Sequence, residues 1–405
     1  MDIICSKDIL NEAVTPALYA VSNKNTVQTL EGLLITADKD SGTLIICGYD
    51  LEKGIKVTIS GEGVQIKESG KIILNAIKFS SIIRNLPDKD ISITTDDKFL
   101  AIISGVKSIF KLHGLDGDTY PLMPALKGEQ SFKISRKILK NMLNSTLFAV
   151  AHNNSRPSLN GALFDIKDNR LNIVGVDSNM LALRRSFDGI VSNKETSTEL
   201  NFIVPGKSLS ELLKLIGDED EQIEIELTRK HIIISVDNII YFSRLIESEF
   251  MDYRRVVKIE PKITVVIDAK SFAESVERAA ILTEDKQKAA VKLILNFIKQ
   301  ESILEDEKNT GILQITFKSS LGEVCDECNI EMYGEDLQIG FNHRYLLDTL
   351  KAVREEKIML KFESPTKSLI VLPYDEDNKD LDIQNYMDIE NSRFLYVVMP
   401  VRLVH

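Results

Sequence analysis

The residues best placed to bind a metal or exchange electrons are Cys325 and Cys328, the only pair with Cys-x-x-Cys spacing. Two thiols at this spacing could supply half of a zinc site or a redox disulfide. However, no second pair or nearby histidine completes the set. The surrounding alternation of residue types predicts a strand, in which positions three apart face opposite sides. We therefore interpret the pair as a coincidence of strand sequence.

Other patterns also fall short of a catalytic or cofactor site. Ser60-Gly-Glu-Gly63 lacks the Gly-Lys-Ser/Thr of a phosphate loop, and Asp116-Gly-Asp118 lacks the remaining ligands of a calcium loop. Asp50 and Asp177 occupy equivalent places in a repeat, so turn hydrogen bonding is a better interpretation than an acid/base pair. The sequence predicts a protein with no catalytic residues, no metal and no cofactor. An enzyme built on repeated α+β units remains an alternative that a turnover assay would test.

The chain repeats itself, which indicates that one supersecondary unit was built more than once. Leu44-x-Ile46-x-Gly48-x-Asp50 recurs as Leu171-x-Ile173-x-Gly175-x-Asp177. At an offset of 129, nine residues are identical: Ser6, Ile9, Leu10, Leu18, Ala20, Val21, Leu30, Gly32 and Leu34 match Ser135, Ile138, Leu139, Leu147, Ala149, Val150, Leu159, Gly161 and Leu163.

A second helical pattern closes each unit and is followed by a short strand-like segment. A third, more diverged copy begins near residue 269. We predict an α+β fold of three similar domains over residues 1–128, 129–261 and 262–405, each of usual domain size. Pro16 lies inside the first predicted helix, where it should kink or break it. The predicted helices cover residues 6–20, 75–86, 135–149, 206–217, 269–283 and 342–356.

The charge of the chain is unevenly distributed. Its net charge is −11, which by itself argues against a nucleic-acid partner. The six predicted helices nevertheless hold 13 Lys and Arg against 8 Asp and Glu. The pattern favours a shared basic surface on the helices, and it argues against a repeat scaffold with no nucleic-acid role. With no apolar run of about 20 residues, no signal peptide and four cysteines, we expect a cytoplasmic protein without a membrane partner.

Five segments remain that none of these patterns explains. They are Arg156-Pro-Ser-Leu-Asn-Gly161, Val176-Asp-Ser-Asn-Met-Leu-Ala182, Glu249-Phe-Met-Asp-Tyr-Arg-Arg-Val256, Ile339-Gly-Phe-Asn342 and Tyr396-Val-Val-Met-Pro-Val-Arg-Leu403. Together they resemble the bacterial DNA sliding clamps, the beta subunits of DNA polymerase III, and the resemblance spans the chain. It implies a head-to-tail homodimer that closes into a ring, with helices lining the interior and antiparallel sheets outside. Such a ring is a processivity factor that encircles double-stranded DNA independently of sequence.

The resemblance also implies a peptide-binding cleft that takes linear motifs, such as Gln-x-x-Leu-x-Phe, from the replicative polymerase catalytic subunit, the clamp loader and repair polymerases. Leu181, Val256, Val398 and Met399 are expected to line its pocket. The full set implied for the cleft is Leu159, Val176, Ser178, Asn179, Met180, Leu181, Met251, Arg255, Val256, Ser368, Val397, Val398, Met399, Pro400, Val401, Arg402 and Leu403.

Two further sets follow from the ring. The residues expected to face DNA are Lys24, Arg136, Lys137, Lys140, Arg156, Lys207 and Lys214. The residues expected at the dimer interface are Phe110 and Leu112, which would meet Ile281 and Leu282 of the other subunit.

The sequence departs from the family pattern near the cleft. Met251 stands where many members have proline, and Ser178-Asn179-Met180 replaces a turn that usually begins with glycine and ends in arginine. An acidic insertion lies near residues 375–382, and Val404-His405 follow the usual terminal leucine. The motif preference, and whether this is a main or a second-copy clamp, stay open at this point.

Overall fold

The structure, a computed structural model, describes residues 1–22, 27–124, 128–186, 191–192, 199–282, 292–299, 309–319, 321–374 and 392–402. The chain divides into two compact units. One comprises Met1–Lys137, Val191–Glu195 and Lys207–Leu245, and the other comprises Ile138–Ile190, Thr196–Gly206 and Ile246–His405. Among the described residues, no helix is long and apolar enough to cross a membrane.

The first unit contains a five-stranded sheet, in the order β5-β1-β7-β8-β9, and a ten-stranded sheet, in the order β10-β6-β2-β3-β4-β19-β18-β17-β11-β15. Helices α1 (Lys7–Ala17) and α2 (Ala76–Asn85) pack together and bury Leu10, Val14, Phe79 and Ile83. The strands are β1 (Asp2–Ser6), β2 (Gly32–Asp38), β3 (Thr43–Tyr49), β4 (Lys53–Ser60), β5 (Val64–Glu68), β6 (Gly70–Asn75), β7 (Asp90–Thr95), β8 (Leu100–Ser104), β9 (Ile109–His113), β10 (Leu115–Asp116), β11 (Gln130–Ser135), β15 (Val191–Ser192), β17 (Gln222–Leu227), β18 (His231–Val236) and β19 (Ile239–Arg244).

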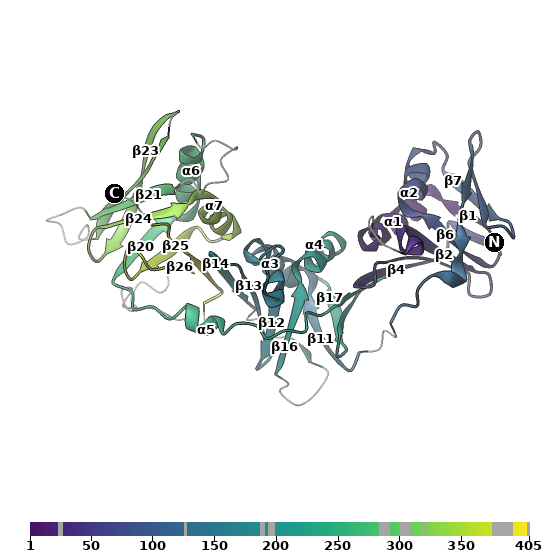
Figure 1. Cartoon of the computed structure of the whole chain (residues 1–405), viewed down its shortest axis with the longest axis horizontal. Coiled ribbons are helices and arrows are strands. Elements are labelled where there is room, and N and C mark those ends of the chain that lie inside the picture. Colours follow the sequence, from purple (N-terminus) through teal and green to yellow (C-terminus); the bar gives the residue numbers. More distant parts are fainter. Residues whose placement is uncertain are drawn as a thin grey trace. The chain divides into compact units, whose positions relative to one another are not determined.

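The second unit contains a twelve-stranded sheet, in the order β16-β12-β13-β14-β27-β26-β25-β20-β23-β22-β21-β24. Helices α6 (Ala269–Ala280) and α7 (His343–Ala352) lie side by side (Figure 1). Phe272 and Leu346 enter the same core. The strands are β12 (Gly161–Lys167), β13 (Arg170–Val176), β14 (Met180–Arg185), β16 (Leu200–Pro205), β20 (Ile263–Asp268), β21 (Lys292–Lys299), β22 (Thr310–Ser319), β23 (Gly322–Tyr333), β24 (Leu337–Asn342), β25 (Lys357–Phe362), β26 (Leu369–Pro373) and β27 (Phe394–Val398).

All six predicted helices form, each shorter than expected. The other two are α3 (Arg136–Asn144) and α4 (Gly206–Leu215), and a short α5 (Tyr253–Val256) was not predicted. In the first helix, the α-helical turn continues through Pro16 and ends at Ala17, where a 3-10 turn, η1 (Leu18–Ala20), takes over. Proline has no N–H for an i−4 bond and its ring crowds the i−4 carbonyl, so the α-helix ends one residue after Pro16. The remaining 3-10 turns are η2 (Gln28–Glu31), η3 (Gly117–Thr119), η4 (Leu147–Ala149) and η5 (Pro157–Asn160).

The repeat seen in the sequence has a geometric cause at its glycines. A Cβ on Gly48 would lie 2.1 Å from the carbonyl oxygen of Ala17, and a Cβ on Gly175 would lie 2.5 Å from that of Thr146. In both copies, therefore, a strand passes so close to the end of the preceding helix that only glycine fits.

The repeated aspartates also have equal roles, as predicted. Asp50 Oδ1 accepts hydrogen bonds from the backbone N–H of Glu52 and Lys53, at 3.0 and 2.9 Å. Asp177 Oδ1 accepts them from Asn179 and Met180, at 2.6 and 2.8 Å. Each carboxylate thus fixes the turn that follows its strand.

The cysteine pair lies in β23, with Cys325 exposed and Cys328 buried, as the predicted alternation requires. Cys328 Sγ is 3.1 Å from Ser275 Oγ of α6. Among the residues that the structure describes, no group of three or more His, Cys, Asp or Glu side chains could hold a metal ion.

Replacing Gly175 with alanine should lower the free energy of unfolding by about 1–3 kcal/mol, because the added methyl group would meet a backbone carbonyl that cannot move alone. Gly217→Ala is the matched control, since its Cβ would meet only the flexible end of Glu219. That control should change stability by no more than about 0.5 kcal/mol. Urea unfolding followed by circular dichroism measures both, and equal midpoints would contradict the packing argument.

Candidate functional site

The C-terminal strand β27 is the centre of the predicted peptide site. It lies between β14 and β26, pairing Met180 with Val398 and Leu181 with Val397 on one side. On the other side, Ile370 of β26 pairs with Val397. Beyond the strand, the N–H of Met399 donates to the carbonyl oxygen of Asn179 at 2.9 Å. Sequence segments near residues 180 and 398 are therefore held together by main-chain hydrogen bonds.

The two faces of β27 belong to different cores. Val397 packs with Leu159, Val176 and Leu181 in one apolar cluster. Val398 packs with Met180 in the core that contains α6 and α7, and it is fully buried there. The expectation that Val398 lines a peptide pocket with Leu181 is therefore wrong, because neighbouring strand residues point to opposite sides. Val397 holds that place.

Helix α5 adds the next wall of the cluster. Met251 and Val256 are partly buried and pack against the residues around Leu181. Arg255 points to solvent, with 84% of its side chain exposed, and its Nε lies 3.0 Å from Asp252 Oδ2. The expected apolar wall and its neighbouring cation are thus brought together.

The residues after β27 form an exposed rim. Met399 is 42% exposed, Pro400 and Val401 are half-buried, and Arg402 is exposed. The N–H of Val401 donates to the carbonyl oxygen of Gly340 at 2.8 Å, which holds the segment against β24. Ser368 is half-buried before β26, and Leu403 lies outside the described residues.

Tyr345 of α7 is a residue that the sequence reasoning missed. Its hydroxyl oxygen accepts a hydrogen bond from Asn179 Nδ2 at 3.1 Å, while Ser178 beside it is exposed. The only sequence signal was its position three residues after the Ile339-Gly-Phe-Asn342 motif. Apolar side chains with a few polar groups and an exposed thioether suit an extended peptide with apolar anchors.

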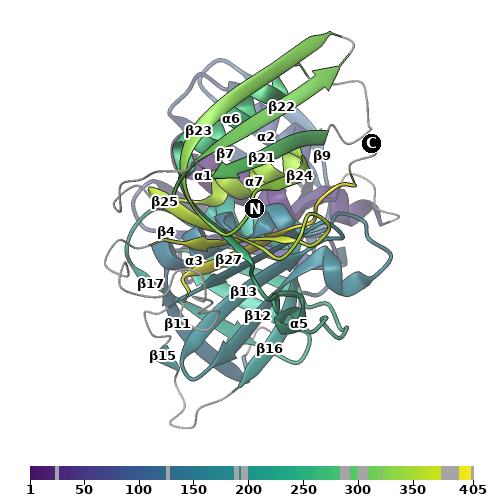
Figure 2. The same ribbon diagram turned by 90° about the vertical axis from the view of Figure 1, so that its left-hand side faces the viewer.

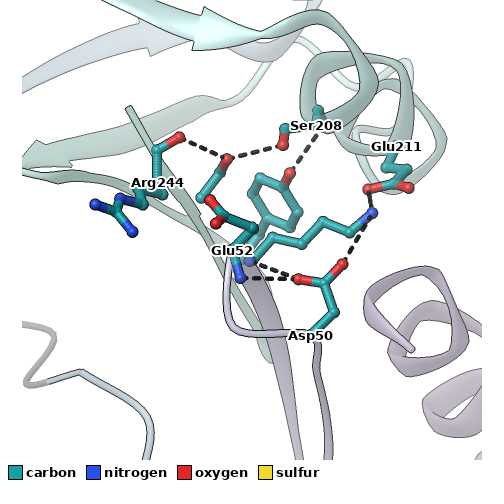
Figure 3. Close-up of polar contacts among 8 residues, drawn as sticks. Asp50, Glu52, Ser208, Glu211 and Arg244 are labelled. Carbon is teal, nitrogen blue, oxygen red and sulfur yellow. Dashed lines mark hydrogen bonds and ion pairs between the residues drawn. The ribbon is translucent and has the colours of Figure 1, made fainter. Parts of the chain in front are cut away.

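A different set of contacts organises the helix predicted to carry Lys207 and Lys214. Tyr241 of β19 donates to the carbonyl oxygen of Ser208 at 2.9 Å, and Ser243 Oγ donates to Ser208 Oγ at 2.8 Å (Figure 3). These bonds fasten the start of α4 to the sheet. Lys207 and Lys214 stay exposed, and Lys214 Nζ lies 4.9 Å from the centre of the Tyr19 ring. Helix α4 is thus placed beside η1.

Lys53 is a cation that cannot contact DNA, although it lies near α4. Its buried ammonium pairs with Glu211 of α4 and lies 3.8 Å from Asp50 Oδ2 (Figure 3). Burial raises the pKa of the Glu211 carboxyl, and the hydrogen bond from Lys53 opposes that shift. The pair connects β4 to α4, and strand β4 also pairs with β19 in the sheet.

The remaining residues predicted to face DNA differ in their exposure to solvent. Arg136 is buried, and its guanidinium nitrogens lie 2.6 Å from Asp237, 3.1 Å from Glu221 and 3.6 Å from Glu219. We therefore remove it from the set, because three carboxylates already neutralise it. Lys137 and Arg156 are exposed, and Lys140 is half-buried. Lys24 lies outside the described residues.

The residues predicted at the dimer interface also differ in how much of each side chain is exposed. Ile281 is 77% exposed and Phe110 is 39% exposed. Leu112 and Leu282 are half-buried, and Leu282 packs against the core of its own unit. Substituting Leu282 would therefore affect that core as well as any interface.

The comparisons with known proteins agree across the whole chain. It matches the DNA polymerase III beta subunit family in the N-terminal domain over residues 1–124, the central domain over 133–252 and the C-terminal domain over 254–386. The beta sliding clamp of Halalkalibacterium halodurans is 31% identical over 384 residues, covering 93% of this chain and 97% of the relative. That of Staphylococcus epidermidis is 31% identical over 387 residues, covering the same shares.

Solved structures give the same result. The DNA polymerase sliding clamp of Bacillus subtilis has a TM-score of 0.87 and 27% identity, and a DnaN sliding clamp of Pseudomonas aeruginosa bound to griselimycin has 0.84 and 25%. Both comparisons cover 100% of each chain. The chain belongs to the DNA polymerase III beta subunit family, the bacterial sliding clamps. It has the three-domain clamp fold and is a non-catalytic processivity factor in DNA replication.

Removing Glu211 should destabilise the protein strongly, because it leaves the buried ammonium of Lys53 without its nearest counter-charge. Glu211→Ala should cost about 3 kcal/mol of unfolding free energy. Glu277→Ala is the matched control, because Glu277 pairs at 3.0 Å with Lys351 but both side chains are largely exposed. The control should cost less than about 1 kcal/mol. A similarly small shift of the urea midpoint in both variants would show that leaving the buried Lys53 ammonium without Glu211 costs little free energy of unfolding.

Proposed function

We propose that two copies of this chain close head-to-tail into a ring around double-stranded DNA and tether polymerases through the site beside β27. The observation that carries the ring is a pair of open sheet edges. Strand β9 pairs only with β8 among the described strands. On the side of β23 opposite β22, the described strands pair only from Glu331 to Tyr333, with β20, so within the described residues the edge of its earlier residues is open (Figure 2).

The open edges fit a heterologous contact between two copies. Within the described residues, the unpaired part of each edge presents backbone N–H and C=O groups that another strand can pair with. Phe110 of β9 and Ile281 after α6 are exposed apolar side chains on the respective units, and burying them would add to the contact at about 25 cal/mol per Å². A head-to-tail contact whose rotation closes yields a ring.

The proposed DNA surface consists of basic helix residues that remain exposed. Lys137, Lys207 and Lys214 have this property. Contacts of lysine with phosphates carry no sequence information, so the ring would hold DNA and still slide. Enclosure, rather than tight binding, would retain the DNA, which accords with a net charge of −11.

The proposed partners at the peptide site are the replicative polymerase catalytic subunit, the clamp loader and repair polymerases. They would insert apolar side chains against Leu181, Val256, Val397 and Met399. The arrangement supports this because an apolar wall, a solvent-facing Arg255 and an exposed Met399 lie around one strand pair. Because these partners work on the chromosome, we place the protein in the cytoplasm.

The ring predicts topological binding. The protein, loaded on nicked circular DNA, should remain bound through gel filtration and be lost when the circle is linearised, because a sliding ring leaves over free ends. Ile281→Asp should be monomeric in light scattering and retained on neither form, since a buried unpaired charge opposes the interface.

Two controls complete this experiment. Leu122→Asp changes an exposed leucine that lies outside β9, β23 and the segment after α6, so it should leave the dimer intact. Equal retention of the wild type on circular and linear DNA would argue for an ordinary surface binder. An unchanged dimer for Ile281→Asp would contradict the placement of the interface.

The peptide site predicts that Met399→Ala weakens a Gln-x-x-Leu-x-Phe peptide by about tenfold or more, because a central buried contact costs about 2 kcal/mol on truncation. Removing residues 399–405 should abolish binding while the dimer persists. Val398→Ala is not a suitable test, because Val398 belongs to the other core. Calorimetry measures the affinity, and an unchanged value for the deletion would mean that partners bind elsewhere.

A further inference from the structure

Asp165 is a buried carboxylate that belongs to none of the predicted sites, and an acidic side chain contributes neither to an apolar core nor to a DNA contact. It lies in β12, in a strand whose other residues up to Ile166 are also buried, and only 8% of it is exposed. A buried carboxylate is costly unless it is hydrogen-bonded or paired. Two donors meet this requirement, and both come from α5.

The first donor is the hydroxyl of Tyr253, which lies 2.7 Å from Asp165 Oδ2. Tyr253 is itself buried, and burial raises the pKa of its hydroxyl, so it remains a donor at neutral pH. The second donor is Arg254, whose guanidinium nitrogen lies 2.8 Å from the same oxygen. The Arg254 guanidinium carbon also lies 4.8 Å from the centre of the Tyr253 ring. One carboxylate oxygen therefore fixes two consecutive residues.

Helix α5 needs such an anchor because it is only four residues long. A single turn has little helical stability of its own and depends on tertiary contacts. Consecutive residues in a helix project about 100° apart, so fixing Tyr253 and Arg254 on the sheet determines where Arg255 and Val256 point. Those two residues face solvent and the apolar cluster, respectively.

We infer that Asp165 is a positioning residue for peptide recognition. It holds Tyr253 and Arg254 on β12 and thereby presents Val256 to the peptide's apolar side chains and Arg255 to its polar groups. The inference rests on the proposed peptide site. It adds a residue that touches no peptide and lies in a different strand from every residue expected to do so.

The test compares peptide affinity in variants of the full-length dimer. Asp165→Ala removes the acceptor for both donors, and Asp165→Asn keeps an oxygen for Tyr253 but loses the charge that holds Arg254. Lys167→Gln is the matched control on the same strand, because Lys167 pairs with Glu199 at 2.9 Å with both side chains exposed. Calorimetry with the Gln-x-x-Leu-x-Phe peptide should show a loss of about tenfold for Asp165→Ala, a smaller loss for Asp165→Asn and none for the control.

A double-mutant cycle separates positioning from general destabilisation. Tyr253→Phe and Arg254→Gln together remove the two donors, so adding Asp165→Asn to that pair should cost no further affinity. Hydrogen exchange at residues 253–257 should quicken in all of these variants, while retention on circular DNA stays within about twofold of wild type. If Asp165→Ala does not fold, the Tyr253→Phe and Arg254→Gln variants give the same readout.

Three outcomes would overturn the inference. They are unchanged peptide affinity in the Asp165 and α5 variants, additive losses in the cycle, or a parallel loss of DNA retention that marks a global effect. Failure of the wild-type protein to bind the peptide is a distinct result. It would reject the proposed peptide site itself and, with it, the role of Asp165.

Discussion

The main-chain pairing of β27 between β14 and β26 is the constraint on which the proposed peptide site depends. Five residue pairs join β27 to β14 and three join it to β26, so the C-terminal strand completes a sheet begun by the central segment. Strand pairing of this kind fixes register, and register decides which side chains share a face. It places Val397 with Leu181 and sends Val398 to the opposite core. A similar junction, β4 with β19, joins the N-terminal and central segments within the other compact unit.

These two junctions account for the difference between sequence repeats and compact units. The predicted boundaries near residues 128 and 261 follow the repeat, and the three family matches follow it too. The compact units do not, because backbone hydrogen bonds across β4–β19 and β14–β27 tie neighbouring repeats together. The boundaries themselves stay a prediction. The buried pair of Lys53 and Glu211 also connects β4 of the N-terminal segment to α4 of the central segment, so Lys53 is unavailable to DNA.

The sequence predicted elements and the clamp fold well but predicted individual side-chain roles less well. Helical spacing and the glycine–aspartate repeat are local signals, and both are visible in the structure as helices and turns. The prediction that Arg136 faces DNA was wrong because its guanidinium pairs with Asp237 and Glu221. These residues lie about 100 and 85 positions away, so no local sequence pattern reveals the pairing. The prediction for Val398 was wrong because the register of strand pairing decides which side chains face which core. Tyr345 and Asp165 were missed because single residues outside a motif acquire a role only through contacts made by folding.

The structure gives Asn179 and Met180, which depart from the family pattern, definite structural roles. Met180 is buried in the core with Val398, so its side chain supports the sheet rather than the surface. Asn179 instead connects the turn to Tyr345, and its carbonyl oxygen accepts from Met399, so one residue links β14, α7 and the segment after β27. Asp177 also fixes that turn, because its carboxylate accepts hydrogen bonds from the backbone N–H groups of Asn179 and Met180. A turn held at three points is pre-organised, and pre-organisation favours binding by reducing the ordering cost. The proposed peptide surface would therefore be set by Asn179, Met399 and the α5 residues that we infer Asp165 positions, rather than by Met180.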